Sequence, residues 1–109
     1  MNYRIVFLAS AEQDLKELKR YIVKNFSPQA WHSTYGKLKE SIFNLKAFPL
    51  SGAIPEELAQ LNITQYRQIV SGMNRVIYEA RQNTIYIHIV ADTRKDMKTL
   101  LIQRVLRDN

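Results

Sequence analysis

Two amphipathic stripes at helical spacing follow one another in the first half of the chain, and the dipeptide Ser27-Pro28 lies between them. Apolar residues recur in both stripes every three or four positions, the period of one face of an α-helix. Serine is a preferred helix N-cap and proline is favoured at the first helical position, so one helix ends here and another begins. The stripes consist of Ala11, Leu15, Leu18, Ile22 and Phe26, then Trp31, Tyr35, Leu38, Ile42 and Leu45. They predict an antiparallel helical hairpin that must pack on another layer.

Further signals mark where the first and the last helix begin. Ser10 followed by Gln13 has the spacing of a capping box, which predicts that Ser10 is the N-cap of the first helix. Thr93 followed by Asp96 resembles an acidic form of the same box. A basic amphipathic segment with Met97, Leu100 and Leu101 comes next, and we expect it to form a C-terminal helix.

Strand-like segments supply the layer that the hairpin needs. Residues 2–8 are apolar on both faces, as in a strand that is covered on two sides. Segments 65–70, 75–80 and 84–91 are joined by the short turns 71–74 and 81–83, which predicts a three-stranded antiparallel meander. In the last segment, simple alternation places Ile85, Ile87 and Ile89 on one face and Tyr86, His88 and Val90 on the other.

The resulting order is strand, two helices, three strands and a helix, or βααβββα, which is an α+β architecture. The connection 48–64 is irregular, with room for one turn of helix. A length of 109 residues fits one domain that spans residues 1–109. The apolar runs are too short to cross a bilayer and the N-terminus does not resemble a secretory signal, so we expect no membrane partner.

Composition excludes several classes of chemistry. The chain has no cysteine, which rules out a disulfide scaffold, a thiolate metal site and a cysteine nucleophile, and is compatible with the reducing cytoplasm. The three glycines are isolated and form no phosphate-binding loop. His32 and His88 lie in different predicted elements without acidic ligands at metal-binding spacing. We therefore expect no metal and no cofactor, with His32 on the surface and His88 half-buried in a strand.

The net charge of +6 is concentrated in the second half of the chain. Residues 1–63 carry eight Lys/Arg and six Asp/Glu, whereas residues 64–109 carry eight and four. Arg67 and Arg75 lie in successive strands, and antiparallel pairing is expected to bring them close, with Arg94 and Lys95 after the last strand. Such a set of cations fits a phosphate or a carboxylate-rich partner, although solvated edge charges give the same pattern.

A second group of cations lies in the first helix. Lys16, Lys19, Arg20 and Lys24 are interleaved with Glu12, Asp14 and Glu17. Opposite charges three or four residues apart pair on a helix surface, so this run is expected to be a solubilising face.

Three strings together resemble the RelE/ParE superfamily of type II toxins: FPLSGAIPEEL (48–58), YRQIVSGMNRVIYEA (66–80) and IYIHIVADTRKDMKTLLIQRVL (85–106). AEQDLKELKRYI (11–22) fits the same pattern, so the resemblance covers nearly the whole chain. It implies a helical hairpin against a twisted antiparallel sheet. It also implies a cognate antitoxin that wraps the hairpin and the sheet and forms a hetero-oligomer with the toxin.

The superfamily has two functional branches. The RelE-like branch comprises ribosome-dependent mRNA endonucleases, and in this chain Arg67, Arg75 and Arg94 match basic positions of that branch. Such a reaction needs a proton acceptor, a proton donor and charge stabilisation at the phosphate. Ile69 stands at a second basic position, and residues 97–109 lack the Tyr or His of the nuclease set.

The ParE-like branch acts by binding DNA gyrase, and Arg94-Lys95-Asp96 leading into a leucine-rich helix looks more like this branch. The interpretation that we favour is a gyrase-inhibiting binder rather than an enzyme, with direct nucleic-acid contact left open. The resemblance places target binding at Arg67, Arg75, Arg94 and Lys95. It places antitoxin binding at Leu15, Leu18 and Ile22.

Overall fold

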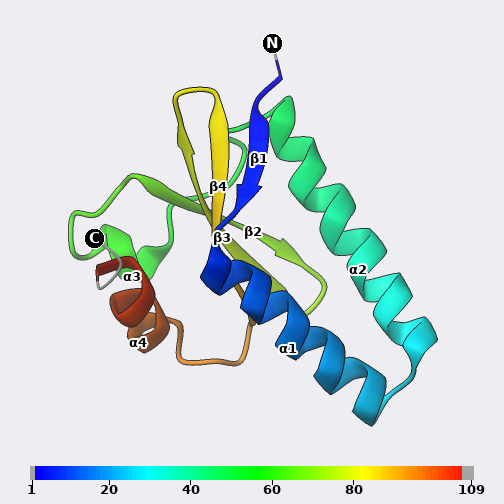
Figure 1. The fold of residues 1–109 in the computed structure, drawn as a ribbon. Coiled ribbons are helices and arrows are strands. Elements are labelled where there is room, and N and C mark those ends of the chain that lie inside the picture. Colours follow the sequence, from blue (N-terminus) through cyan, green and yellow to red (C-terminus); the bar gives the residue numbers. More distant parts are fainter. Residues whose placement is uncertain (1, 107–109) are drawn as a thin grey trace.

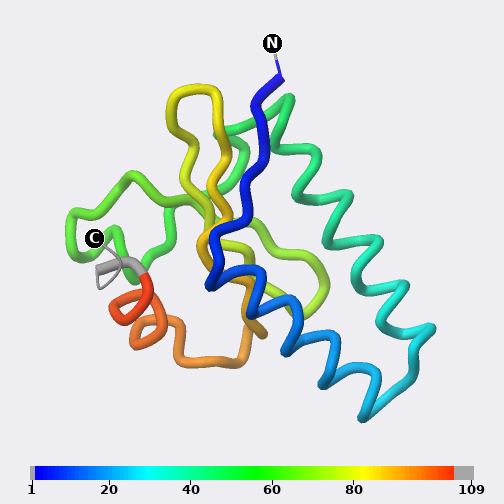
Figure 2. Tube along the Cα trace, in the orientation of Figure 1, coloured from blue at the N-terminus to red at the C-terminus, as the bar shows by residue number. Residues whose placement is uncertain are grey.

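The computed structural model describes residues 2–106 and has the predicted α+β architecture (Figure 1). Its four-stranded sheet has the order β1-β4-β3-β2. Strands β2 (Tyr66–Ser71), β3 (Asn74–Arg81) and β4 (Thr84–Asp92) form the predicted antiparallel meander. Strand β1 (Arg4–Phe7) pairs in parallel with the start of β4, although the two are far apart in sequence (Figure 2). The meander turns are tighter than predicted, with two residues each, and both residues of the second turn have positive φ, as a tight hairpin requires.

The predicted helical hairpin is present as α1 (Ala9–Asn25) and α2 (Pro28–Phe43), followed by the 3₁₀ turn η1 (Asn44–Lys46). Ser27 is the N-cap of α2, and its hydroxyl accepts a hydrogen bond of 3.0 Å from the backbone N–H of Ala30. The prediction of a cap at Ser10 is wrong, because α1 begins at Ala9 with Leu8 as N-cap. Leu8 still donates its N–H to Ile87 on the sheet while its carbonyl accepts from Glu12, so the chain passes from strand to helix within one residue.

The sheet has helices on both faces. The hairpin covers one face over a core that includes Leu38, Ile42, Tyr78 and Ile87. The other face is covered by α3 (Glu56–Ala59), α4 (Met97–Leu101) and the π-helical turn η2 (Ile102–Leu106). A second core lies there, formed by Leu58, Tyr66, Ile77, Ile89, Ala91, Met97 and Leu101. Asp96 itself is the N-cap of α4, bonded to the N–H and hydroxyl of Thr99, so the predicted capping box from Thr93 is wrong.

A β-bulge corrects the predicted alternation in β4. Ile77 pairs with Ile89 but the next residue, Tyr78, pairs with Ile87, so His88 is an extra residue in its strand. Ile85 and Ile87 therefore face the hairpin as Val90 does, whereas Ile89 lies in the second core. The bulge supplies apolar side chains to both cores from one strand.

The irregular connection after α2 is fastened along the outer edge of β2. The fully buried Tyr78 donates its hydroxyl to the carbonyl of Pro49 at 2.9 Å and accepts from the N–H of Gly52 at 3.0 Å. Ala53 forms a bridge with Gln68. A Cβ atom at Gly52 would lie 2.5 Å from the carbonyl oxygen of Gln68, so the close approach of the two backbones requires glycine. None of the helices that the structure describes is long and apolar enough to span a membrane.

Candidate interaction surface

A continuous groove lies between the helical hairpin and one end of the sheet. It consists of two adjoining pockets of about 440 and 420 Å³ that share Leu18, Tyr21, Asn74, Asp92 and Arg94. We call it the hairpin groove, and it is also lined by Asp14, Glu17, Ile22, Phe26, Ala30, Ser33, Thr34, Lys37, Ser71, Gly72, Met73, Val90, Ala91 and Lys95. Phe26, Met73 and Tyr21 are 69%, 55% and 51% exposed, so apolar surface is open to a partner.

Arg94 and Lys95 provide positive charge at this groove. The backbone N–H of Arg94 and its guanidinium Nε and Nη2 donate to the carboxylate of Asp92 at 2.8–2.9 Å. The Arg94 side chain is nevertheless 70% exposed. Leu18 and Ile22 line the same surface, so the structure joins two residues predicted to bind the target with two predicted to bind the antitoxin.

The titration of Asp92 tests the contact that orients Arg94. Hydrogen bonds from the Arg94 side chain and backbone lower the pKa of Asp92 from 3.8 to about 2. A carboxyl with a lowered pKa in the folded state stabilises that state above its unfolded pKa, and the effect is lost as pH falls towards 2. Carbon NMR of the Asp92 carboxyl should therefore show a midpoint near 2 that returns towards 3.8 in Arg94→Ala. An unchanged midpoint in that variant would contradict the contact.

Arg67 and Arg75 do not come together, and the expectation that pairing brings them close is wrong. Arg67 pairs with Tyr78, whereas Arg75 pairs with Val70, so their positions are offset by three residues along β2. Side chains alternate along a strand, which places the two arginines on opposite faces of the sheet. Arg67 donates from one guanidinium nitrogen to the carbonyls of Gly52 (2.8 Å) and Leu50 (3.3 Å).

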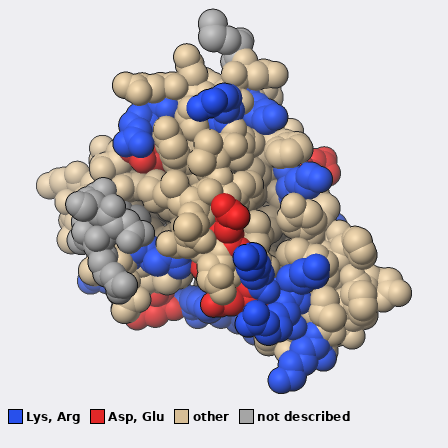
Figure 3. All heavy atoms as spheres, viewed as in Figure 1, with Lys and Arg blue, Asp and Glu red and all other residues tan. Residues whose placement is uncertain are grey.

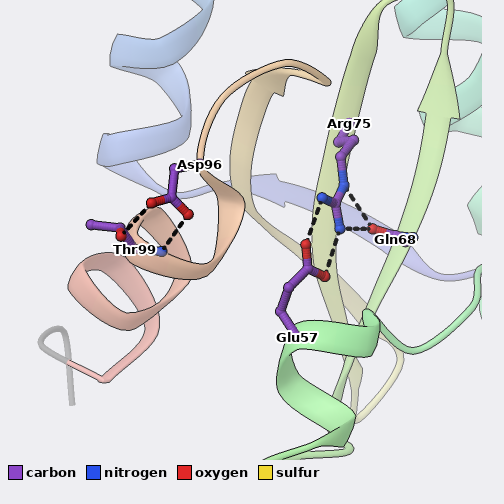
Figure 4. A network of polar contacts seen from close by, with 5 residues as sticks. All are labelled: Glu57, Gln68, Arg75, Asp96 and Thr99. Carbon is purple, nitrogen blue, oxygen red and sulfur yellow. Dashed lines mark hydrogen bonds and ion pairs between the residues drawn. The ribbon is translucent and has the colours of Figure 1, made fainter.

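Arg75 is engaged on the second face (Figure 4). Its guanidinium makes a bidentate pair with Glu57 at 3.0 and 3.1 Å, and its Nε donates to Gln68 at 2.8 Å. Its side chain is only 13% exposed, and the hydrogen bonds from Arg75 lower the pKa of Glu57. Arg75 thus fastens α3 to the sheet. Sequence reasoning missed Glu57, for which the available signal was a pair of glutamates beside a predicted helical turn.

A second ion pair, between Asp14 and Arg104, forms hydrogen bonds with backbone groups at one edge of β4. Strand β1 ends at Phe7 opposite Ile87, so within residues 2–106 no strand pairs with the following part of this β4 edge. Asp14 accepts from the Val90 N–H at 3.0 Å and from Arg104 at 2.7 and 3.1 Å. Arg104 also donates to the His88 carbonyl at 3.0 Å. The pair ties the C-terminal segment to α1, and it was missed because its members are 90 residues apart.

Leu15 and His88, which the sequence also singled out, lie outside the hairpin groove. Leu15 lines a separate pit of about 120 Å³ with Phe7, Tyr35 and Ile42 and is not part of the hairpin groove. His88 is half-buried as predicted, with its Nε2 at 3.3 Å from Glu79 and its ring edge-on to Tyr66. In the described part of the chain, no group of three or more His, Asp or Glu residues is placed to hold a metal.

Comparison with solved structures identifies a protein of similar fold. The chain resembles a chain of the chromosomal ParDE toxin–antitoxin system from P. aeruginosa with a TM-score of 0.69 and 14% sequence identity, over 83% of this chain and 95% of that chain. At this identity the likeness concerns the fold. No curated protein sequence gives a significant match. Residues 5–97 match the family model of the ParE toxin of type II toxin–antitoxin systems, parDE. The chain belongs to this family and is a ParE-type toxin.

Proposed function

We propose that this toxin inhibits DNA gyrase by binding it, and that a cognate antitoxin holds the toxin inactive by occupying the hairpin groove. The observation that carries the choice of a binder over a nuclease is the separation of Arg67, Arg75 and Arg94. Arg67 lies against the 49–52 segment, and Arg75 is paired with Glu57 on the opposite face of the sheet. Arg94 is paired with Asp92 at the hairpin groove. Phosphoryl chemistry needs donors that converge on one phosphate, and these three do not.

The hairpin groove supports the antitoxin part of the proposal. Its wall combines the apolar side chains of Leu18, Ile22 and Phe26 with the cations Arg94 and Lys95. An amphipathic segment with acidic residues along one side complements this combination, because its apolar face fills the groove while its carboxylates meet the cations. Since Arg94 and Lys95 also belong to the proposed target surface, such a segment excludes gyrase by competition.

A supercoiling assay with purified gyrase tests the proposed target. The wild-type toxin should inhibit supercoiling, and Arg94→Ala/Lys95→Ala should need at least about tenfold more toxin, which corresponds to about 1.4 kcal/mol. Both side chains are exposed, so the variant should fold normally. Lys39→Ala is the matched control, because Lys39 is an exposed cation that does not line the groove.

Two results would overturn the proposed target. Full supercoiling at a large excess of folded toxin would exclude inhibition of gyrase. Cleavage of mRNA on translating ribosomes by the same preparation would instead support the RelE-like alternative, and that activity should then be lost in Arg75→Ala.

A further inference from the structure

The outward face of α1 carries a row of cations that no carboxylate of residues 2–106 pairs with. Lys16, Arg20 and Lys24 follow one another at intervals of four residues, and Lys19 lies beside them. All four are exposed. Figure 3 shows basic side chains gathered over α1 on this side of the molecule. None of the four lines the hairpin groove.

These cations are not neutralised in the way that the sequence suggests. Among residues 2–106, no ion pair joins any of the four to a carboxylate, so the expected pairs along the helix are absent. Asp14, one of the three acidic residues in α1, is turned to Arg104 and Val90 instead. Residues 18–25 contain Lys19, Arg20 and Lys24 and no carboxylate. The second half of α1 therefore presents a net positive surface.

The dimensions of the row match a phosphate backbone. A helix rises 1.5 Å per residue, so Lys16 and Lys24 are about 12 Å apart along the axis. One strand of duplex DNA carries a phosphate about every 3.4 Å along its axis, so this length faces roughly three to four phosphates. A row of four cations can contact them one to one.

The chemistry of the face favours nucleic acid over an acidic protein. The stripe residues Ala11, Leu15, Leu18 and Ile22 are turned into the molecule, and Tyr21 lines the hairpin groove. Val23, which is 37% exposed, is the apolar anchor that helical spacing places among the cations. Protein interfaces depend on such anchors, especially buried aromatic side chains. Binding to a phosphate backbone needs none, because release of condensed counterions from the DNA supplies most of the free energy.

We propose that the outward face of α1, through Lys16, Lys19, Arg20 and Lys24, binds the phosphate backbone of duplex DNA without sequence preference. The proposal does not rest on gyrase inhibition, because it concerns bare DNA. It assigns to this toxin a second surface, separate from the hairpin groove, that would keep the protein close to DNA.

The test is the salt dependence of binding between the full chain and a fluorescent duplex of about 20 base pairs, measured by anisotropy between 50 and 200 mM salt. Each phosphate contact contributes about −0.9 to the slope of log K against log salt, so four contacts predict a slope of −3 to −4 and roughly a hundredfold loss of affinity over this range. Lys19→Gln/Arg20→Gln/Lys24→Gln should reduce the slope to about −1.

The control variant is Lys39→Gln/Lys46→Gln/Lys98→Gln, which removes the same charge from other elements and should keep the wild-type slope. Circular dichroism verifies that both variants are folded. Equal slopes for the two triple variants, or no binding of the duplex by wild type at 50 mM salt, would overturn the proposal. A glutamate-rich peptide that competes as well as the unlabelled duplex would show an acidic protein to be the partner, and would overturn it as well.

Discussion

Replacing Phe26 with alanine is expected to weaken antitoxin binding about thirtyfold or more, with almost no change in the free energy of unfolding. Phe26 is 69% exposed in the toxin, and its ring packs edge-on against Tyr21 with ring centres 6.2 Å apart. A ring that is exposed before binding and buried afterwards contributes mainly to the interface, where truncation of a central aromatic side chain costs about 2 kcal/mol or more. Titration calorimetry with the antitoxin encoded beside the toxin measures the affinity, and urea unfolding measures the stability.

Phe48→Ala provides the matched control for this experiment. Phe48 is 66% exposed, like Phe26, but it follows η1 and does not line the hairpin groove. The control should leave the affinity within about twofold of wild type. If Phe48→Ala weakened binding as much as Phe26→Ala, or if Phe26→Ala had no effect, the antitoxin would have to bind outside the hairpin groove.

Removing the Arg75 side chain is expected to destabilise the folded protein by about 2–3 kcal/mol. Breaking a buried ion pair by deleting one partner costs about 3–5 kcal/mol, and the pair here falls below that range because the Glu57 side chain is 28% exposed. Arg75→Ala would leave Gln68 and the Glu57 carboxylate without their donor and would release α3 from the sheet. Urea unfolding of Arg75→Ala, Glu57→Gln and the double variant isolates the coupling between the two side chains.

The coupling energy between Arg75 and Glu57 that this double-mutant cycle measures should depend on pH. Because Arg75 lowers the pKa of Glu57 below 4.5, the pair should stabilise the fold above pH 4.5 and lose its effect as pH falls below that value. The control is Arg81→Ala, since Arg81 is 57% exposed and lies 3.8 Å from Glu79, an arrangement that contributes less than about 1 kcal/mol. A coupling energy near zero between Arg75 and Glu57 at pH 7 would mean that the pair does not fasten α3.

Features that depend on local periodicity were predictable. The hairpin follows from apolar residues spaced by three or four positions and from the Ser27-Pro28 junction, and the meander follows from short turns between β-branched segments. The position of Ser10 shows the limit of this reasoning. A good capping residue was available, but pairing of β1 with β4 fixed Leu8 one residue before the helix and overrode the local preference.

The interaction surface was predictable only in part. Arg94, Lys95, Leu18 and Ile22 were identified as candidate residues, and the fold gathers them in one groove, although their roles in binding stay predictions. The predicted turn 71–74 and the observed two-residue turn give the same register, with Val70 opposite Arg75. Arg67 and Arg75 lie on opposite faces because Arg67 is an odd number of positions, three, from Val70 along β2.

The amino-acid sequence by itself determined the elements, their order and a surplus of positive charge, because helix and strand periods and turn chemistry act over a few residues. The tertiary structure decided which charges are free. Arg75 and Arg104 are held by Glu57 and Asp14, whereas the cations on the outward face of α1 have no carboxylate partner among the described residues. Pairing of charges depends on contacts between segments as far apart as 90 residues, which no local pattern encodes.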